Sequence, residues 1–183
     1  MKFTSLSIDQ FQRIAAIEAN GDPALKKVAT IAVIRNISLD ESKKLPLTEV
    51  NEAYKSFEES VKQLPTLKYQ EYVKCNGKKY KLVLFTDELT GGQLIEMLSY
   101  DLRDEYQVVQ NLHKIMATLA CERTWWRTKP YDGATHGKRA EEFKQLSMKD
   151  VWGAVSFFLL ASESYSKIMM RYSEALMKTM AKG

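Results

Sequence analysis

The sequence has few of the residues that form covalent or metal-based sites. Its two cysteines, Cys75 and Cys121, lie far apart, which excludes a disulfide framework and is typical of a protein in a reducing compartment. Four prolines and eight glycines in 183 residues exclude a low-complexity chain. Because 45% of the residues are hydrophobic and 27% are charged, we expect a globular core and a single domain, residues 1–183.

The motifs of several enzyme classes are also missing. The chain has no G-x-G-x-x-G, no G-x-S-x-G, no C-x-x-C and no H-E-x-x-H, which argues against the corresponding dinucleotide, hydrolase and zinc sites. Asp101, Asp104 and Glu105 cluster at a predicted helix junction, where a solvated charged surface is the ordinary interpretation. We therefore expect no catalytic residue, no cofactor and no enzymatic activity.

The four soft metal-ligand residues do not have the spacing of a metal site. They are Cys75, His113, Cys121 and His136. His113 and Cys121 are two helical turns apart, roughly 12 Å along a helix axis, which is too far to share an ion. We interpret His113 as a histidine at the core boundary and expect no metal site.

Two adjacent glycines in "FTDELTGGQLIEML" raise the question of a phosphate-binding loop. A Walker A loop requires a lysine and a hydroxyl residue after its last glycine, but Gln93 and Leu94 follow Gly92. Thr90 and Gln93 have the spacing of a capping box, in which each side chain satisfies a backbone amide of the other. The segment is therefore predicted to begin a helix.

No stretch of the chain predicts export or a membrane span. The start "MKFTSLSIDQF" lacks the apolar segment of a secretory signal. The most apolar run near the end, Val155–Ala161, is far too short to cross a bilayer. We expect the protein to work in the cytoplasm or in a particle assembled there.

Apolar residues recur at helical spacing through most of the chain and predict a mainly α fold of about seven helices. The helices fall in an N-terminal part, residues 7–65, and a C-terminal part, residues 90–183. The predicted N-terminal caps are Ser7, Asp22, Ser38, Thr48, Thr90 and Ser147.

The pattern changes to alternation between the two helical parts. Residues 67–75 and 78–85 alternate apolar and polar side chains around Asn76-Gly77, the strongest short-range signal for a β-hairpin. A two-residue loop places Val73 opposite Tyr80 and Tyr69 opposite Leu84. We therefore predict one hairpin, residues 67–86.

A long C-terminal helix is predicted after Ser147, because no proline and no glycine follows Gly153 until Gly183. About 30 helical residues span roughly 45 Å, so its far end is expected to reach a partner. Met169, Met170 and Met177 crowd this segment. Methionine is common both at binding surfaces and as core filler, so these three residues are candidates for partner binding.

The irregular segment 122–138, within "CERTWWRTKPYDGATHGKR", is the most unusual part of the chain. Its aromatic residues are Trp125, Trp126 and Tyr131, and Arg127 is one of several cations between them. Such residues anchor protein interfaces and also stack nucleic-acid bases. A third interpretation is that one tryptophan fills the core beneath the loop. Because the net charge is only +4, nucleic acid is the less favoured partner.

Five segments, in this order, resemble a loosely defined group of small proteins encoded among the head, neck and tail genes of tailed bacteriophages. They are "LPLTEVNEAYKSFEESVKQL", "VKCNGKKYKL", "DELTGGQLIEMLSY", "NLHKIMATLAC" and "SFFLLASESYSKIM". The resemblance covers roughly residues 45–170. It is strongest at the Asn76-Gly77 hairpin, the Thr90–Gln93 turn and the Asn111–Ala117 helix, none of which is a catalytic motif.

The resemblance implies a non-enzymatic role in building or joining virion parts, through contacts with other phage proteins and with further copies of the chain. A connector or ring subunit near the portal, neck or tail would be found in the virion. A transient tail assembly chaperone would act only in the host cytoplasm. A nucleic-acid-binding module is the alternative of another class, and it would use Trp125, Trp126, Arg127 and the hairpin lysines Lys74, Lys78, Lys79 and Lys81.

Overall fold

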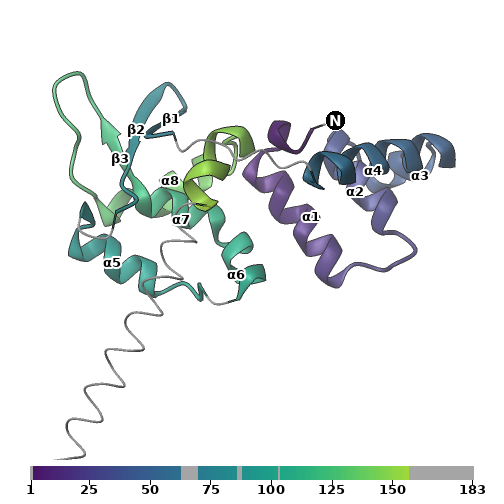
Figure 1. Ribbon diagram of the computed structural model, residues 1–183, viewed down its shortest axis with the longest axis horizontal. Coiled ribbons are helices and arrows are strands. Elements are labelled where there is room, and N and C mark those ends of the chain that lie inside the picture. The colour runs from purple at the N-terminus through teal and green to yellow at the C-terminus, as the bar shows by residue number, and fades with distance from the viewer. Residues whose placement is uncertain (1, 63–69, 86–87, 103, 157–183) are drawn as a thin grey trace, which may run out of the picture.

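The computed structural model describes residues 2–62, 70–85, 88–102 and 104–156. It shows a mainly helical chain with a three-stranded antiparallel sheet. Figure 1 places the N-terminal helices on one side and the sheet with the later helices on the other, with α1 between them. The mainly α prediction is confirmed.

The N-terminal part contains a 3₁₀ turn and four helices. Their bounds are η1 Phe3–Ser5, α1 Ile8–Asn20, α2 Lys26–Arg35, α3 Leu39–Lys43 and α4 Leu47–Lys62.

The remainder of the described chain contains the sheet and the other helices. Their bounds are β1 Tyr72–Cys75, β2 Lys78–Leu82, α5 Gly91–Leu98, α6 Glu105–Gln110, α7 Leu112–Leu119, β3 Ala120–Arg123, η3 Gly133–Thr135 and α8 His136–Phe143, followed by helical residues 148–156.

Three of the predicted helix caps have the geometry of a full capping box. Ser7 with Gln10, Ser38 with Glu41, and Thr90 with Gln93 exchange the reciprocal hydrogen bonds of that motif. Ser147 lies directly before the helical residues 148–156, and its Oγ accepts a hydrogen bond from the amide of Lys149.

Two other predicted caps are wrong. The Asp22 side chain accepts a hydrogen bond from the amide of Ala24, but the residues after it form a turn, and α2 begins only at Lys26. Thr48 lies inside α4, because that helix begins at Leu47, directly after Pro46. Proline at the preceding position, rather than the threonine hydroxyl, marks this helix start.

The hairpin register is confirmed, and its strands are shorter than predicted. Val73 is paired with Tyr80 across β1 and β2. Asn76 and Gly77 have positive φ, 47° and 74°, as a type I′ turn requires. The predicted pairing of Tyr69 with Leu84 stays a prediction, because Tyr69 lies outside the described residues.

The structure adds a strand that was not predicted. β3 pairs antiparallel with β2, from Lys79 opposite Arg123 to Leu82 opposite Ala120. It enters the segment 122–138 that was expected to be irregular. α7 ends at Leu119 and β3 begins at the next residue, so the chain passes from helix to strand without a loop.

The two parts share one hydrophobic core, and hydrogen bonds join them at two places. Backbone amides of Ile8 and Met148 bond to carbonyls of Leu146 and Leu6, respectively, at 2.9 and 2.8 Å. The side chain of Gln12, on α1, reaches the carbonyl of Val109 at 2.9 Å. The largest fully buried side chains are Phe3, Phe143, Leu6, Ile8, Ile31, Leu82, Leu84, Leu112, Ile115, Met116, Leu119 and Met148.

Only the first part of the predicted long C-terminal helix lies within the described residues. Residues 148–156 are helical, and its continuation lies outside the described residues. Within the described segments, the helices lack the combination of length and apolar character that a bilayer crossing requires.

Candidate functional site

The two adjacent tryptophans lie at the tip of a hydrogen-bonded turn that follows β3. The amide and Oγ1 of Thr124 donate to the carbonyl of Arg127 at 2.9 and 2.8 Å, and the amide of Arg127 donates to Thr124 Oγ1 at 3.3 Å. Arg123 forms a β-bridge with Thr128 below the turn. We call Thr124–Arg127 the Trp turn; its backbone is held by its own hydrogen bonds, so its shape does not depend on a partner.

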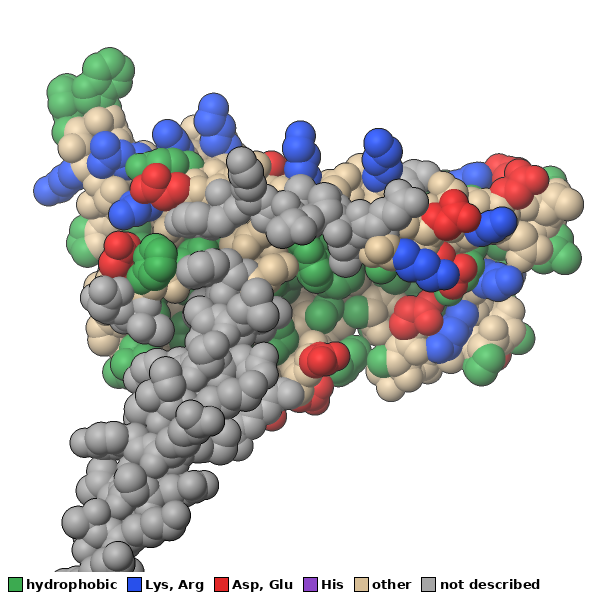
Figure 2. All heavy atoms as spheres, in the orientation of Figure 1, with side chains coloured by type: hydrophobic (Ala, Val, Ile, Leu, Met, Phe, Trp, Pro, Cys, Tyr) green, Lys and Arg blue, Asp and Glu red, His purple; other side chains and the backbone are tan. Residues whose placement is uncertain are grey.

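Both tryptophans of the Trp turn point into solvent. Trp125 is 86% exposed and Trp126 is 83% exposed, and their ring centroids lie 5.9 Å apart. In Figure 2 hydrophobic side chains project at the same end of the molecule that carries the loop after β3 in Figure 1. The interpretation that one tryptophan fills the core is therefore wrong, because the turn carries both side chains away from the core.

The surroundings of the Trp turn are cationic, but part of the charge is neutralised. Glu122 Oε1 accepts from Lys129 Nζ at 2.7 Å and its Oε2 accepts from Lys78 Nζ at 3.2 Å. The bond from Lys129 and that from Lys78 hold the pKa of Glu122 below its usual value. Lys81 lies within 4 Å of two carboxylates, those of Glu71 and Glu88.

Among the other predicted contact residues within the described segments, Arg127 lies with the tryptophans and Tyr131 does not. Tyr131 is half-buried, and its ring packs 6.4 Å from the ring of His136. Its hydroxyl is buried, and burial raises its pKa. Tyr131 therefore belongs to the base of the segment, not to its tip. Arg127 lies at the tip, whereas Met169, Met170 and Met177 lie outside the described residues.

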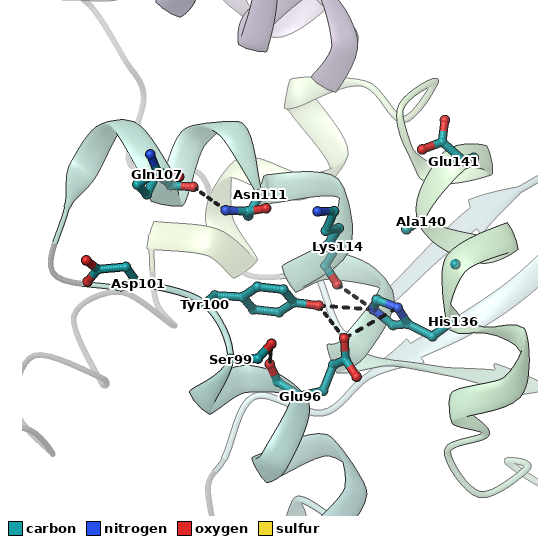
Figure 3. Close-up of a pocket in the computed structure, with 11 residues that line it drawn as sticks. Glu96, Ser99, Tyr100, Asp101, Gln107, Asn111, Lys114, His136, Ala140 and Glu141 are labelled. Atoms are coloured by element: carbon teal, nitrogen blue, oxygen red, sulfur yellow. Dashed lines mark hydrogen bonds and ion pairs between the residues drawn. The ribbon is translucent and has the colours of Figure 1, made fainter.

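A polar pocket of about 610 Å³ lies between α5, α6, α7 and α8. Figure 3 shows Glu96, Tyr100 and His136 pointing toward one another at its base. The Tyr100 hydroxyl donates to Glu96 Oε1 at 2.8 Å, and His136 Nδ1 lies 3.7 Å from the same oxygen. Burial strongly raises the pKa of Tyr100, so its phenol keeps its proton at neutral pH.

Three protein groups lie within hydrogen-bond distance of the second ring nitrogen of His136. His136 Nε2 lies 3.1 Å from Thr118 Oγ1, 3.2 Å from the carbonyl of Lys114 and 3.4 Å from the Tyr100 hydroxyl. These contacts join α8 to α7 and to the segment after α5. Sequence reasoning missed this network, because its members come from three separate segments with no motif spacing.

The four soft metal-ligand residues are found in different surroundings. The Sγ of Cys75 contacts the carbonyl of Glu142, and His113 Nδ1 lies 2.8 Å from Gln12 Nε2. Cys121 lies beside Gln93. Across the segments that the structure describes, no group of three such ligands comes together.

The double-glycine segment has the geometry of a helix start. Gly91 and Gly92 are the first two residues of α5. Gln93, only 1% exposed, accepts from the Thr90 amide at 3.0 Å and donates through Nε2 to the Thr118 carbonyl at 2.8 Å. The glutamine therefore both caps α5 and fastens it to α7.

The three predicted surface carboxylates are exposed, as expected. Asp104 accepts from the amides of Tyr106 and Gln107 at 2.9 and 3.4 Å and caps α6. Asp101 lines the polar pocket, and Glu105 lies in the first turn of α6.

Comparison of the chain with protein-family models, with curated proteins and with solved structures finds no match.

Proposed function

We propose that this chain is a non-enzymatic structural or morphogenesis protein of a tailed bacteriophage. It acts by protein–protein contacts near the portal, neck or tail, as a connector or ring-type subunit. The observation that supports this proposal is the Trp turn: two tryptophans, 86% and 83% exposed, on a self-bonded turn.

The chemistry of the Trp turn favours a protein as its partner. Each tryptophan offers on the order of 200 Å² of surface, most of it apolar, whose removal from water favours association. Tryptophan and arginine are also the residues most enriched among the strong anchors of protein interfaces. Because the backbone of the turn is already held, ordering it on binding costs little conformational entropy.

The phage assignment rests on the sequence resemblance, and particle analysis tests it. Mass spectrometry of purified virions of the encoding phage should detect this chain at a fixed ratio to a portal or tail protein. Absence from mature particles, together with presence in assembly intermediates, supports the alternative of a transient tail assembly chaperone. Absence from both, with normal particle yield after deletion of its gene, contradicts the whole proposal.

A nucleic-acid-binding module is the second candidate, because the two exposed tryptophans lie between Arg123 and Arg127 in the sequence. Lysine and arginine side chains also line the upper edge of the molecule in Figure 2. The pairing of Lys78 and Lys129 with Glu122 weakens this candidate. Binding to single-stranded DNA should then fall steeply with salt and require both tryptophans. Binding that persists after Trp125→Ala with Trp126→Ala contradicts this role.

A further inference from the structure

A second exposed apolar surface lies on α5. Ile95 is 73% exposed, Leu98 is 75% exposed, and Leu94 is also exposed. Positions i, i+1 and i+4 of a helix share one side, so these three side chains form one continuous patch, which we call the α5 patch.

The α5 patch places large apolar side chains on the outer side of the helix, where an amphipathic helix usually carries polar ones. On its inner side α5 buries Gln93 and Met97, and the amide of Gln93 binds the carbonyl of Thr118. Its leucines and isoleucine face outward instead. A helix that places an amide inside and three large aliphatic side chains in water is typical of a surface that another molecule covers.

The net charges of the two segments that carry the apolar surfaces are opposite in sign. Residues 85–103, which contain the α5 patch, include four carboxylate residues and one arginine, and one of these carboxylates, Glu88, is paired with Lys81. Residues 122–129, which contain the Trp turn, include three cationic residues and one carboxylate, Glu122, which is paired with Lys129. Opposite charge around two apolar centres steers them toward each other and disfavours contact between two like surfaces.

The two surfaces cannot meet within one molecule. Figure 1 shows the tip of the loop after β3 above the sheet and α5 below the sheet, in the same half of the molecule. We propose that the chain associates head to tail, with the Trp turn of one copy bound to the α5 patch of the next. This proposal rests on the proposed function, since it names a partner for the Trp turn.

A head-to-tail contact leaves one free Trp turn and one free α5 patch on every assembly that does not close. Such heterologous contacts therefore continue until they form a ring or an open chain. The partner of the Trp turn is then a second copy of this chain.

Complementation between two variants tests this arrangement. The turn variant carries Trp125→Ser and Trp126→Ser, and the patch variant carries Ile95→Ser and Leu98→Ser. Each variant alone should be monomeric by light scattering at concentrations where the wild-type chain is oligomeric. An equimolar mixture should form a dimer and nothing larger, because it contains one intact turn and one intact patch.

Matched controls separate this contact from general changes in surface. Leu47, at the start of α4, is 72% exposed, and Leu47→Ser should leave association unchanged. Arg127→Glu should weaken association at least tenfold, whereas Lys138→Glu, an equal charge change on α8, should alter it less than twofold. Circular dichroism should show that all variants have the wild-type helical content.

Three results overturn the proposal. One is a wild-type chain that stays monomeric up to about 100 µM, a concentration at which even a weak specific contact is populated. Another is a patch variant that still associates while the turn variant does not, because that result indicates a turn-to-turn contact. The last is a mixture that fails to form the dimer.

Failure of the head-to-tail proposal can be distinguished from failure of the proposed phage function. A monomeric chain that is nevertheless present in virions leaves the phage role intact and assigns the Trp turn to a different phage protein. A chain that forms head-to-tail oligomers and is absent from particles and intermediates leaves the self-association intact and contradicts the phage role.

Discussion

Residues 123–129 and residues 131–139 both combine aromatic with cationic side chains, and their surroundings are opposite. In the first segment both tryptophans are exposed and point away from the sheet. In the second, Tyr131 is half-buried and both His136 and Arg139 are buried. The same residue types therefore lie in solvent in the first segment and within the packed structure in the second.

The difference between the two segments follows from the carbonyl groups that each can reach. Arg139 donates to the carbonyls of Ala117 and Ala120 at 3.2 and 2.8 Å, where α7 ends and leaves carbonyls without helical partners. A cation is also favoured at the negative end of a helix dipole. The hydrogen bonds of the Trp turn instead join Thr124 and Arg127 to each other.

The largest expected effect comes from removing the cation that the second segment buries. Arg139→Leu should lower the free energy of unfolding by about 3 kcal/mol, because buried carbonyls lose a charged donor. Arg127→Leu, in the first segment, should change it by less than about 0.5 kcal/mol. Urea denaturation measures both, and equal losses would contradict the distinction between the two segments.

A buried histidine outside both segments should make stability depend on pH. Burial lowers the pKa of His113 to about 4, with a smaller contribution from Lys144. Its Nδ1 faces Gln12 Nε2 at 2.8 Å, so the neutral ring accepts a hydrogen bond that the protonated ring cannot. In the unfolded chain the pKa returns to about 6.5. The unfolded state therefore binds a proton that the folded state does not.

The contribution of His113 is present above pH 6.5 and is lost as the pH falls toward 4. Between pH 7 and pH 5 the free energy of unfolding should decrease by about 2 kcal/mol from this group. His113→Leu should reduce that dependence, while Gln12 Nε2 still donates to the carbonyls of Val109 and Gln110. Denaturant titrations at the two pH values measure the difference, and an unchanged slope in the variant would disprove the assignment.

The capping box at the start of α5 should contribute more than an exposed capping box. Gln93→Ala removes both the cap and the bond to the Thr118 carbonyl, and should cost about 2 kcal/mol. Glu41→Ala removes the matching side chain of the exposed Ser38 box and should cost about 0.5 kcal/mol. Thermal melting of the two variants compares them, and a larger loss for Glu41→Ala would reverse the expected order.

The smallest expected effect is a gain in stability at the base of the second segment. Among the atoms that the structure describes, the buried hydroxyl of Tyr131 has no hydrogen-bond partner. Tyr131→Phe should therefore raise the free energy of unfolding by up to about 1 kcal/mol. Tyr100→Phe is the control, because its hydroxyl bonds to Glu96, and this variant should be less stable. A stability loss in Tyr131→Phe would show that its hydroxyl is satisfied.

Sequence reasoning succeeded where a structure depends on neighbouring residues. The capping boxes at Ser7, Ser38 and Thr90 and the Asn76-Gly77 hairpin register each involve side chains and backbone within a few residues. The cap prediction at Thr48 failed because Pro46 also marks a helix start, and two local signals competed there.

The third strand could not be predicted from its own residues. Ala120–Arg123 is four residues long and does not alternate, and it becomes a strand because β2 offers an unpaired edge beside the end of α7. The hydrogen-bond network around His136 was missed for a related reason. Glu96, Thr118 and His136 come from separate elements that only packing brings together.

The sequence alone determined the helical character, the helix starts at the three capping boxes, the hairpin and the lack of familiar catalytic motifs. The capping boxes and the hairpin turn are stabilised by contacts between residues that are close in sequence, so they form whatever the rest of the fold is. Tertiary structure alone decided that Trp125 and Trp126 are exposed and that His136 and Arg139 are buried. A cationic side chain is buried only where acceptors such as helix-end carbonyls bind it, and an aromatic side chain is buried only where other side chains pack against it. Both conditions depend on the tertiary structure.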